Sequence, residues 1–283
     1  MVIRKSFFNP SFCNVIMKRF LFVITLISIT ASAGACFADN SNPDPKAGMK
    51  LVWADEFDYP DSQLDENWNS ENGSPRHIVC SRWRENAVVK DGTLRLMNKK
   101  ENRGGKEWTS ASISTKKRFQ YGYFECRYRY AAATGTNNSF WLMTTAPVTG
   151  KNWYAPLDKD HHFEIDVNEG HYPSEVNTNI HNWNDTYVVN GKTRHRSWHK
   201  SFVPDASLDL SKEFHVYGLL WTEKELVFYF DGKELRREPN RCCFIASPIF
   251  LSEAIIPWGG EISDAIDGTC MEVDYVRVYQ AEK

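Results

Sequence analysis

Three short segments near residue 225 follow one another so closely that only turns fit between them. Residues 214–221 (FHVYGLLW), 226–230 (LVFYF) and 233–236 (KELR) are rich in residues that favour strands. Thr-Glu-Lys-Glu separates the first two, and Asp231-Gly232 forms a tight hairpin signal between the last two. No stretch of twelve or more residues combines a 3.6-residue apolar period with capping residues. The pattern therefore constrains the chain to antiparallel β-structure.

Further strands are predicted at 93–96, 121–130 and 271–279. The segment 121–130 (YGYFECRYRY) alternates polar and aromatic residues with a period of two. Aromatic residues make up 14% of the chain, enough for a β-rich core with rings left to line a cleft. The prediction is an all-β fold, a β-jelly-roll sandwich of two antiparallel sheets with an open concave substrate cleft.

The first 35 residues have the layout of a secretory signal peptide. Residues 20–33 are a mainly apolar run of 14 that follows Lys18-Arg19 and ends in small residues. That length is short for a membrane span. Met17 begins a better-proportioned signal than Met1 does, so the true start is either of the two. We expect export, as a secreted or periplasmic protein or as an outer-membrane lipoprotein.

Cleavage after Ala35 would make Cys36 the first mature residue, the position that bacterial lipoproteins modify with lipid. The usual signal has Leu three residues earlier, where this chain has Ala33. The sequence therefore leaves a lipid anchor at Cys36 open. Residues 36–48 read as a tether because they include SNPDPKAG. Residues 49–283 contain no further linker or repeat and are predicted to be a single catalytic domain, acting as a monomer.

Charge and cysteine content exclude several classes of protein. With 34 basic and 36 acidic residues, no nucleic-acid-binding face is expected. Export permits a disulfide, but the spacing of the cysteines selects no pair, and the absence of C-x-x-C argues against a zinc module. His195 and His199 have a spacing that brings two histidines together only on a helix, so no metal pair is predicted there. The cysteines after Cys36 are Cys80, Cys126, Cys242, Cys243 and Cys270.

Three carboxylates fall within residues 163–170 (FEIDVNEG). On a regular strand Glu164 and Asp166 share a face, whereas Glu169 has the wrong parity. One extra residue accommodated as a β-bulge would return Glu169 to the same face. Crowded carboxylates raise one another's pKa, so one acid stays protonated while another stays charged. The alternatives are a solvated strand face or a calcium site, and the apolar flanks of these acids argue against a solvated face.

Glu-Ile-Asp-Val-Asn-Glu resembles the E-x-D-x-x-E signature of glycoside hydrolase family 16 in its bulged form. Residues 51–57 (LVWADEF), 109–127 (TSASISTKKRFQYGYFECR) and 271–280 are similar to further segments of that family. The resemblance covers about 50–280. It implies a jelly roll that cleaves β-linked polysaccharides internally with retention, and a structural calcium ion is possible; no cofactor is required. By the same resemblance, Glu164 is the nucleophile, Glu169 the general acid/base and Asp166 the assisting residue.

One segment of this chain differs from the corresponding segment of the family's β-1,3-glucanases, and this difference narrows the predicted substrate. Members that act on β-1,3-glucans usually carry W-P-A-x-W before the catalytic strand, whereas residues 137–142 here are NNSFWL. This segment is more similar to red-algal galactan hydrolases of the porphyranase or agarase type, so a red-algal galactan is the predicted substrate. The alternatives are an endo-β-1,3-glucanase (laminarinase-like), an enzyme for another β-galactan such as a host glycan, and a non-catalytic carbohydrate-binding jelly roll.

Aromatic, histidine and arginine residues are the expected contacts for the sugar. Flat aromatic rings stack on the C–H faces of sugars, and a guanidinium group binds an oxyanion such as sulfate through two parallel hydrogen bonds. The arginines considered for sulfate are Arg76, Arg82, Arg84, Arg194 and Arg196. The predicted substrate-binding residues are Trp68, Arg76, Trp83, Trp141, Trp153, His162, His181, Trp183 and Trp258.

Overall fold

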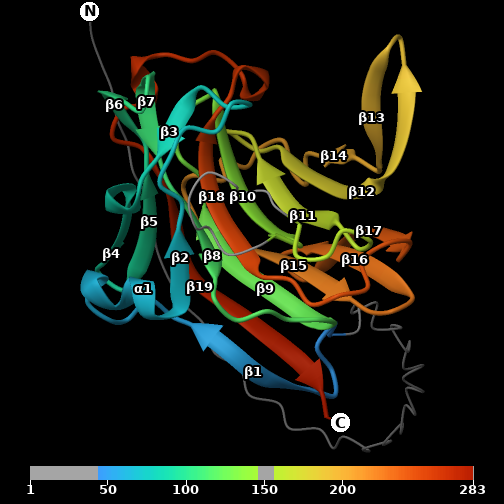
Figure 1. The fold of residues 1–283 in the computed structure, drawn as a ribbon. Coiled ribbons are helices and arrows are strands. Elements are labelled where there is room, and N and C mark those ends of the chain that lie inside the picture. Colours follow the sequence, from blue (N-terminus) through green and yellow to red (C-terminus); the bar gives the residue numbers. More distant parts are fainter. Residues whose placement is uncertain (1–43, 146–155, 283) are drawn as a thin grey trace, which may run out of the picture. The chain divides into compact units, whose positions relative to one another are not determined.

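The computed structural model describes residues 44–145 and 156–282. The predicted signal peptide, Cys36 and Trp153 lie outside the described residues. Within them the chain forms two eight-stranded antiparallel sheets and one small three-stranded sheet (Figure 1). The prediction of an all-β sandwich is confirmed. No helix in the described ranges has the length and apolar character needed to cross a membrane.

The first large sheet collects the late hairpins and the closing strand. The strands predicted at 214–221, 226–230 and 233–236 pair as an antiparallel meander. The sheet order is β17 (Lys233–Pro239), β16 (Glu225–Phe230), β15 (His215–Trp221), β9 (Gly122–Arg129), β19 (Cys270–Ala281), β5 (Thr93–Met97) and β4 (Ala87–Lys90), with β1 (Met49–Asp55) pairing with β19.

The second large sheet contains the strand with the three acids, and a small sheet borders it. The order of the second sheet is β13 (Lys192–Ser197), β12 (Val176–Val189), β11 (Phe163–Gly170), β10 (Thr136–Met143), β18 (Ile249–Ile255), β8 (Ser112–Thr115) and β2 (Trp68–Ser70), with β14 (Lys200–Phe202) pairing with β12. The small sheet has the order β3 (Cys80–Arg82), β7 (Lys106–Ser110) and β6 (Lys99–Arg103). The helical turns are η1 (Asp61–Gln63), α1 (Leu64–Asn67), η2 (Arg84–Asn86), η3 (Pro257–Gly259) and η4 (Asp264–Ile266).

Aromatic side chains fill the space between the two large sheets. Phe163 of β11 packs against Trp221 of β15 with ring centroids 5.7 Å apart, and the Trp221 indole donates to the carbonyl of Cys243 at 2.9 Å. Both rings are fully buried. Rings of this size dominate core energetics, so the inward face of β11 is fixed by packing and its other face is free to line a cleft. None of the five cysteines in the described ranges forms a disulfide.

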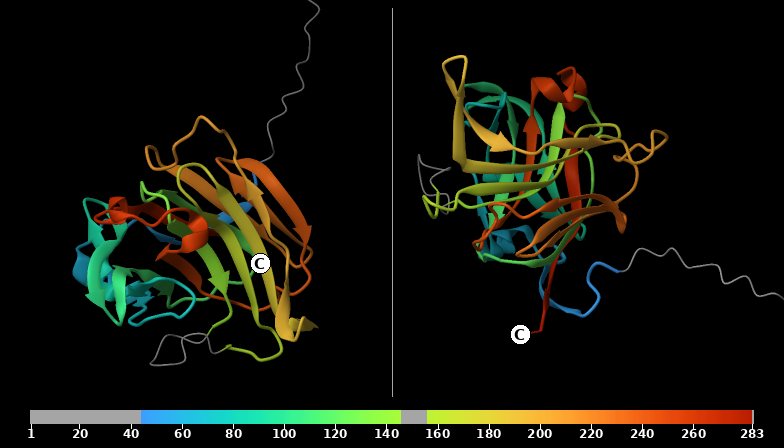
Figure 2. Two further views of the ribbon diagram at one scale, coloured as in Figure 1. Left: turned by 90° about the horizontal axis from the view of Figure 1, so that it is seen from above. Right: turned by 90° about the vertical axis from the view of Figure 1, so that its right-hand side faces the viewer.

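One hairpin leaves the second sheet. The outer half of β12 and all of β13 extend beyond the neighbouring strands (Figure 1, Figure 2). The turn of this hairpin is Asn190-Gly191. Both residues have positive φ, as a two-residue type I′ turn requires. The pairing of the two strands is irregular where they leave the sheet, between Asn182 and Thr186. This irregularity sets the position of His195, which lies opposite Thr186.

Candidate active site

A β-bulge in the catalytic strand places the three acids on one face. Trp141 of β10 pairs with Asp166, but the preceding Phe140 pairs with Asn168, so Val167 has no partner on β10. The extra residue reverses the side-chain alternation, as the sequence predicted. Glu164, Asp166 and Glu169 consequently line the same cavity, of about 550 Å³.

The alternation of neighbouring strands supplies the rest of the cavity wall. Alternate residues of β10 and β18 face the acids, and histidine and tryptophan come from the residue before β11 and from the middle of β12. The predicted residues among the lining are Trp141, His162, His181, Trp183 and Trp258. Asn137 and Ser139, from the segment that suggested the substrate, also line the cavity; the lining residues that the sequence did not indicate include His77, Ile78, Met143, Asn179, Ser252, Ala254 and Ile256. They could have been found only through strand register, which a single sequence does not give.

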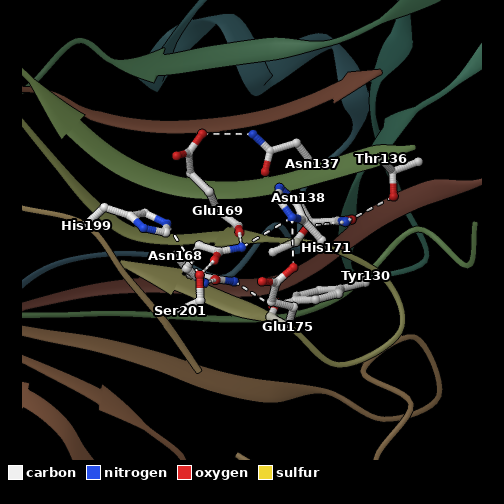
Figure 3. A network of polar contacts seen from close by, with 12 residues as sticks. Tyr130, Thr136, Asn137, Asn138, Asn168, Glu169, His171, Glu175, His199 and Ser201 are labelled. Atoms are coloured by element: carbon white, nitrogen blue, oxygen red, sulfur yellow. Dashed lines mark hydrogen bonds and ion pairs between the residues drawn. The ribbon is translucent and has the colours of Figure 1, made fainter. Parts of the chain in front are cut away.

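The opposite face of β11 is anchored inside the sandwich. Asn168, the residue after the bulge, is fully buried and donates to the hydroxyls of Tyr128 at 2.6 Å and Tyr130 at 2.8 Å. Its side-chain oxygen Oδ1 accepts from the backbone N–H of Asn177 at 3.2 Å. Figure 3 shows this buried polar network beneath the strand that carries Glu169. A fully hydrogen-bonded buried network gives the bulge a single conformation.

Glu169 has a polar neighbour on the adjacent strand. The side-chain amide of Asn137 donates to Glu169 Oε1 at 2.9 Å (Figure 3). Glu169 is only half-buried, whereas Asp166 is 1% exposed. The arrangement leaves Glu169 accessible to both substrate and water.

Glu164 and Asp166 have different partners. The Trp183 indole donates to Glu164 Oε2 at 3.2 Å, and His181 Nε2 lies 3.3 Å from Asp166 Oδ2. Burial raises the pKa of Glu164 well above its ordinary value, and the Asp166 carboxylate raises it further. Burial likewise raises the pKa of Asp166, with Glu169 as the next contribution. Two adjacent carboxylates in this setting retain one proton between them.

Five of the predicted sugar contacts lie in the cavity wall. Trp141 stacks on Phe250 with ring centroids 4.3 Å apart and exposes one edge to the cavity. Trp258 is 59% exposed at the cavity rim. His162 lies beside Trp183, with ring centroids 5.9 Å apart. Together with His181, these residues give the cavity both flat apolar faces and polar groups, which is typical of sugar-binding sites.

The prediction that Trp68 binds substrate is wrong. Trp68 is 1% exposed, and its indole donates to the buried Asp55 carboxylate at 2.8 Å, so it belongs to the core. Two further predictions fail at this cavity. Trp83 lies outside its lining, with the Arg103 guanidinium 3.8 Å above the ring, and Arg76 is exposed and also outside the lining.

Of the arginines considered for sulfate, one lines the cavity. Arg82 of β3 is 4% exposed and binds the buried Glu71 carboxylate at 3.0 Å. Arg84 instead pairs with Asp61 and Asp65, and Arg196 with Asp185. The cavity therefore presents one fixed guanidinium group.

The described residues contain one group spaced closely enough to hold a cation. Glu164, Asp166 and His181 each offer one ligand atom, and these atoms lie within 4.8 Å of one another. The same spacing follows from two carboxylates that share a proton beside an imidazole, which needs no ion. Chemically, the site combines two buried carboxyl groups that share a proton with a third, Glu169, that is open to solvent, and a pair of carboxyl groups is what cleavage of a glycosidic bond requires.

Known proteins share this sequence and architecture. The chain is 29% identical to a β-glucanase of Rhodothermus marinus, over 93% of this chain and 95% of the relative. It is 25% identical to a κ-carrageenase of Pseudoalteromonas carrageenovora, over 90% and 70% of the two chains. A crystal structure of a non-specific endo-β-1,3(4)-glucanase from family GH16 matches with a TM-score of 0.69 and 26% identity, covering 83% of this chain and 92% of that one.

The family model described as glycosyl hydrolases family 16 matches residues 76–275, well over half of the 283 residues. That range includes all three acids and the strands that carry the cavity wall. The chain belongs to glycosyl hydrolase family 16 and is an endo-acting glycosidase of that family.

Proposed function

We propose that this glycosidase hydrolyses internal β-linkages by double displacement with retention of configuration, with Glu164 as nucleophile and Glu169 as general acid/base. The observation that carries the proposal is the bulge between β10 and β11, because it turns both glutamates and Asp166 into one cavity. Without it Glu169 would point into the sandwich. In a retaining glycosidase the nucleophile and the acid/base flank the scissile bond about 5–5.5 Å apart, so both must line one groove.

The partners of each acid support these roles. Glu164 accepts an N–H from Trp183, and a hydrogen bond to a carboxylate favours its charged form. In the first step Glu164 attacks the anomeric carbon and Glu169 protonates the departing oxygen. In the second step Glu169 removes a proton from water, which attacks the same carbon and releases Glu164. Asp166, with its raised pKa, assists by hydrogen-bonding the nucleophile.

We propose a red-algal galactan, of the porphyran or agarose type, as the substrate. At the position where β-1,3-glucanases carry a Trp-Pro pair, this chain has Asn137, whose amide lies in the cavity on Glu169. Arg82 also borders the cavity, where the buried Glu71 carboxylate already neutralises its guanidinium group. The similarity to a κ-carrageenase over 90% of the chain supports a sulfated galactan as well.

An endo-β-1,3-glucan activity is the second candidate. It is favoured by the 29% identity to a β-glucanase over nearly the full length of both chains, and by the fold shared with an endo-β-1,3(4)-glucanase. The stacked pair Trp141 and Phe250 would serve a neutral glucan equally well.

Reducing-end release on porphyran, agarose, κ-carrageenan and laminarin, measured side by side, separates these candidates. We expect cleavage of porphyran or agarose and oligosaccharide products from the earliest time points. Cleavage of laminarin alone would replace the galactan proposal with the glucanase. A Glu164→Gln variant that retains normal turnover would overturn the catalytic assignment on any of these substrates.

We also propose that the protein is exported, as a secreted or periplasmic monomer or anchored through lipid at Cys36. Intact-mass measurement on protein from its native host tests this. A mature chain that begins at Cys36 with added diacylglycerol mass supports the anchor, and an unprocessed Met1 or Met17 contradicts export.

A further inference from the structure

His195 contacts two residues that in turn contact the catalytic carboxylates. The pairing of β12 with β13 skips from Asn182 to Thr186, and His195 lies opposite Thr186. Its Nε2 lies 2.7 Å from His181 Nδ1, and its ring centroid lies 3.8 Å from that of Trp183. His181 and Trp183 are the residues next to Asp166 and Glu164, respectively.

The hydrogen bonds around His181 determine its tautomer. The backbone N–H of Ile180 donates to Asn179 Oδ1 at 2.9 Å, which fixes the orientation of the amide and leaves Asn179 Nδ2 facing His181 Nε2 at 2.7 Å. An amide N–H needs an acceptor, so Nε2 of the neutral ring carries a lone pair. The ring proton is therefore on Nδ1 and is donated to His195 Nε2.

That tautomer affects which carboxylate holds the shared proton. The lone pair on His181 Nε2 faces Asp166 Oδ2, which accepts no hydrogen bond from the described residues. In this tautomer Nε2 carries no proton and its lone pair accepts from Asn179, so Asp166 Oδ2 has no N–H donor from this ring, and this disfavours the charged form of Asp166. Glu164, beside the Trp183 indole N–H, is left charged.

We propose that His195 is a positioning residue that, by accepting the hydrogen bond from His181 Nδ1 and packing against the Trp183 ring, keeps the shared proton on Asp166 and the nucleophile Glu164 charged. The inference rests on the proposed function of Glu164. It assigns the projecting hairpin a role in catalysis, although every residue of β13 except His195 is exposed.

The surroundings of His195 suit this role. Its pKa is lowered by burial, and then by the nearby His181 and Arg194, so at neutral pH the ring is uncharged and Nε2 can accept. The charged or titratable groups that face it are His181 on β12 and Arg194 on its own strand. Within the described residues His195 forms no ion pair with a carboxylate, so no acid competes with His181 Nδ1 for its Nε2.

Two variants separate the hydrogen bond between His195 and His181 from the ring contact between His195 and Trp183. His195→Phe retains a ring on Trp183 and removes the acceptor, whereas His195→Gln offers a side-chain oxygen near the position of Nε2. We expect His195→Phe to lower kcat roughly 10- to 100-fold with KM within about threefold of wild type. His195→Gln should stay within about threefold of wild type in both constants. His199→Ala is the matched control, because the exposed His199 contacts Ser201 and none of the carboxylates.

The tautomer provides a readout that is independent of turnover. Long-range ¹H–¹⁵N spectra of the full-length protein labelled at histidine should show His181 protonated at Nδ1 in wild type and His195→Gln, and a mixture of tautomers in His195→Phe. Unchanged kcat in His195→Phe, an equal loss in both variants, or an Nε2-protonated His181 in wild type would each overturn the proposal. Glu164→Gln is assayed in parallel: if it remains active, the failure lies in the proposed function.

Discussion

Two pairs of ionisable side chains lie at the same cavity, and their surroundings treat their charges in opposite ways. Glu71 and Arg82, both about 5% exposed at their side chains, form an ion pair at 3.0 Å. Glu164 and Asp166 have no such cation among the residues that the structure describes; their neighbours are an indole N–H and an imidazole. The opposite charges of Glu71 and Arg82 neutralise each other within the fold, whereas the carboxylates of Glu164 and Asp166 repel each other.

The difference separates a structural pair from a reactive one. A buried ion pair that loses one partner leaves an uncompensated charge, so its residues depend on each other for stability. Adjacent carboxylates destabilise the folded state but hold one another's pKa at values useful for proton transfer. The comparison predicts that mutations in the first pair lower stability and mutations in the second pair lower activity.

The largest effect is expected for Glu164→Gln. Loss of the nucleophile should lower kcat on the order of 10⁴-fold or more, while oligosaccharide binding persists because the cavity wall is unchanged. Initial rates and isothermal titration with substrate oligosaccharides measure the two properties. Loss of binding with normal turnover would assign the site to a different role.

Arg82→Met should be the most destabilising single change of the comparison. Leaving Glu71 buried and unpaired is expected to lower the free energy of unfolding by about 3–5 kcal/mol. The control is Arg277→Met, which breaks an exposed pair with Glu56 and should cost no more than about 1 kcal/mol. Urea denaturation measures both. If Glu71→Gln in the Arg82→Met background restores no stability, the pair is not the cause.

Gly170→Ala tests how tightly the strand behind the acids is packed. A Cβ at Gly170 would lie 2.2 Å from the Tyr130 ring, which is held by Asn168. Overpacking here should lower the free energy of unfolding by roughly 1–3 kcal/mol. Gly73→Ala is the matched control, because its added Cβ meets nothing within 4 Å. Equal stability of the two variants would show that the back of the bulge is not rigid.

Asp166→Asn should raise stability, by the smallest amount and in a pH-dependent way. Because the folded-state pKa of Asp166 is raised, the folded wild type binds more protons than the unfolded chain, and its stability falls as pH rises from about 4 through the raised pKa. Asn removes this loss. The variant should therefore be more stable than the wild type at pH 8 and close to it at pH 4. A gain that is equal at both pH values would contradict the explanation.

The catalytic strand could be predicted because parity along a strand is a local rule. Glu169 is five residues from Glu164, an odd number, so a shared face required one bulged residue. Another local signal failed for Trp68: its polar sequence neighbours suggested an accessible ring, whereas the indole donates to Asp55 within the core. Its environment depends on a strand that begins nearly twenty residues earlier in the chain.

His195 illustrates what a single sequence cannot provide. Its spacing from His199 was the visible pattern, yet its partner is His181, fourteen residues away on the facing strand. Residues 183–185, which the β12–β13 pairing skips, set that register, and no residue type announces the irregularity. Arg82 is similar, since its place in the cavity comes from the small sheet that borders the site.

The stereochemistry of the first product tests the central claim most directly. ¹H NMR of the reaction, recorded before mutarotation, follows the anomeric protons of the newly formed reducing ends on whichever polysaccharide the enzyme cleaves. If Glu164 and Glu169 act from one bulged strand as nucleophile and acid/base, the β-anomer appears first and the α-anomer grows in later. Initial release of the α-anomer would mean inversion, and would contradict the assignment of Glu164 as nucleophile.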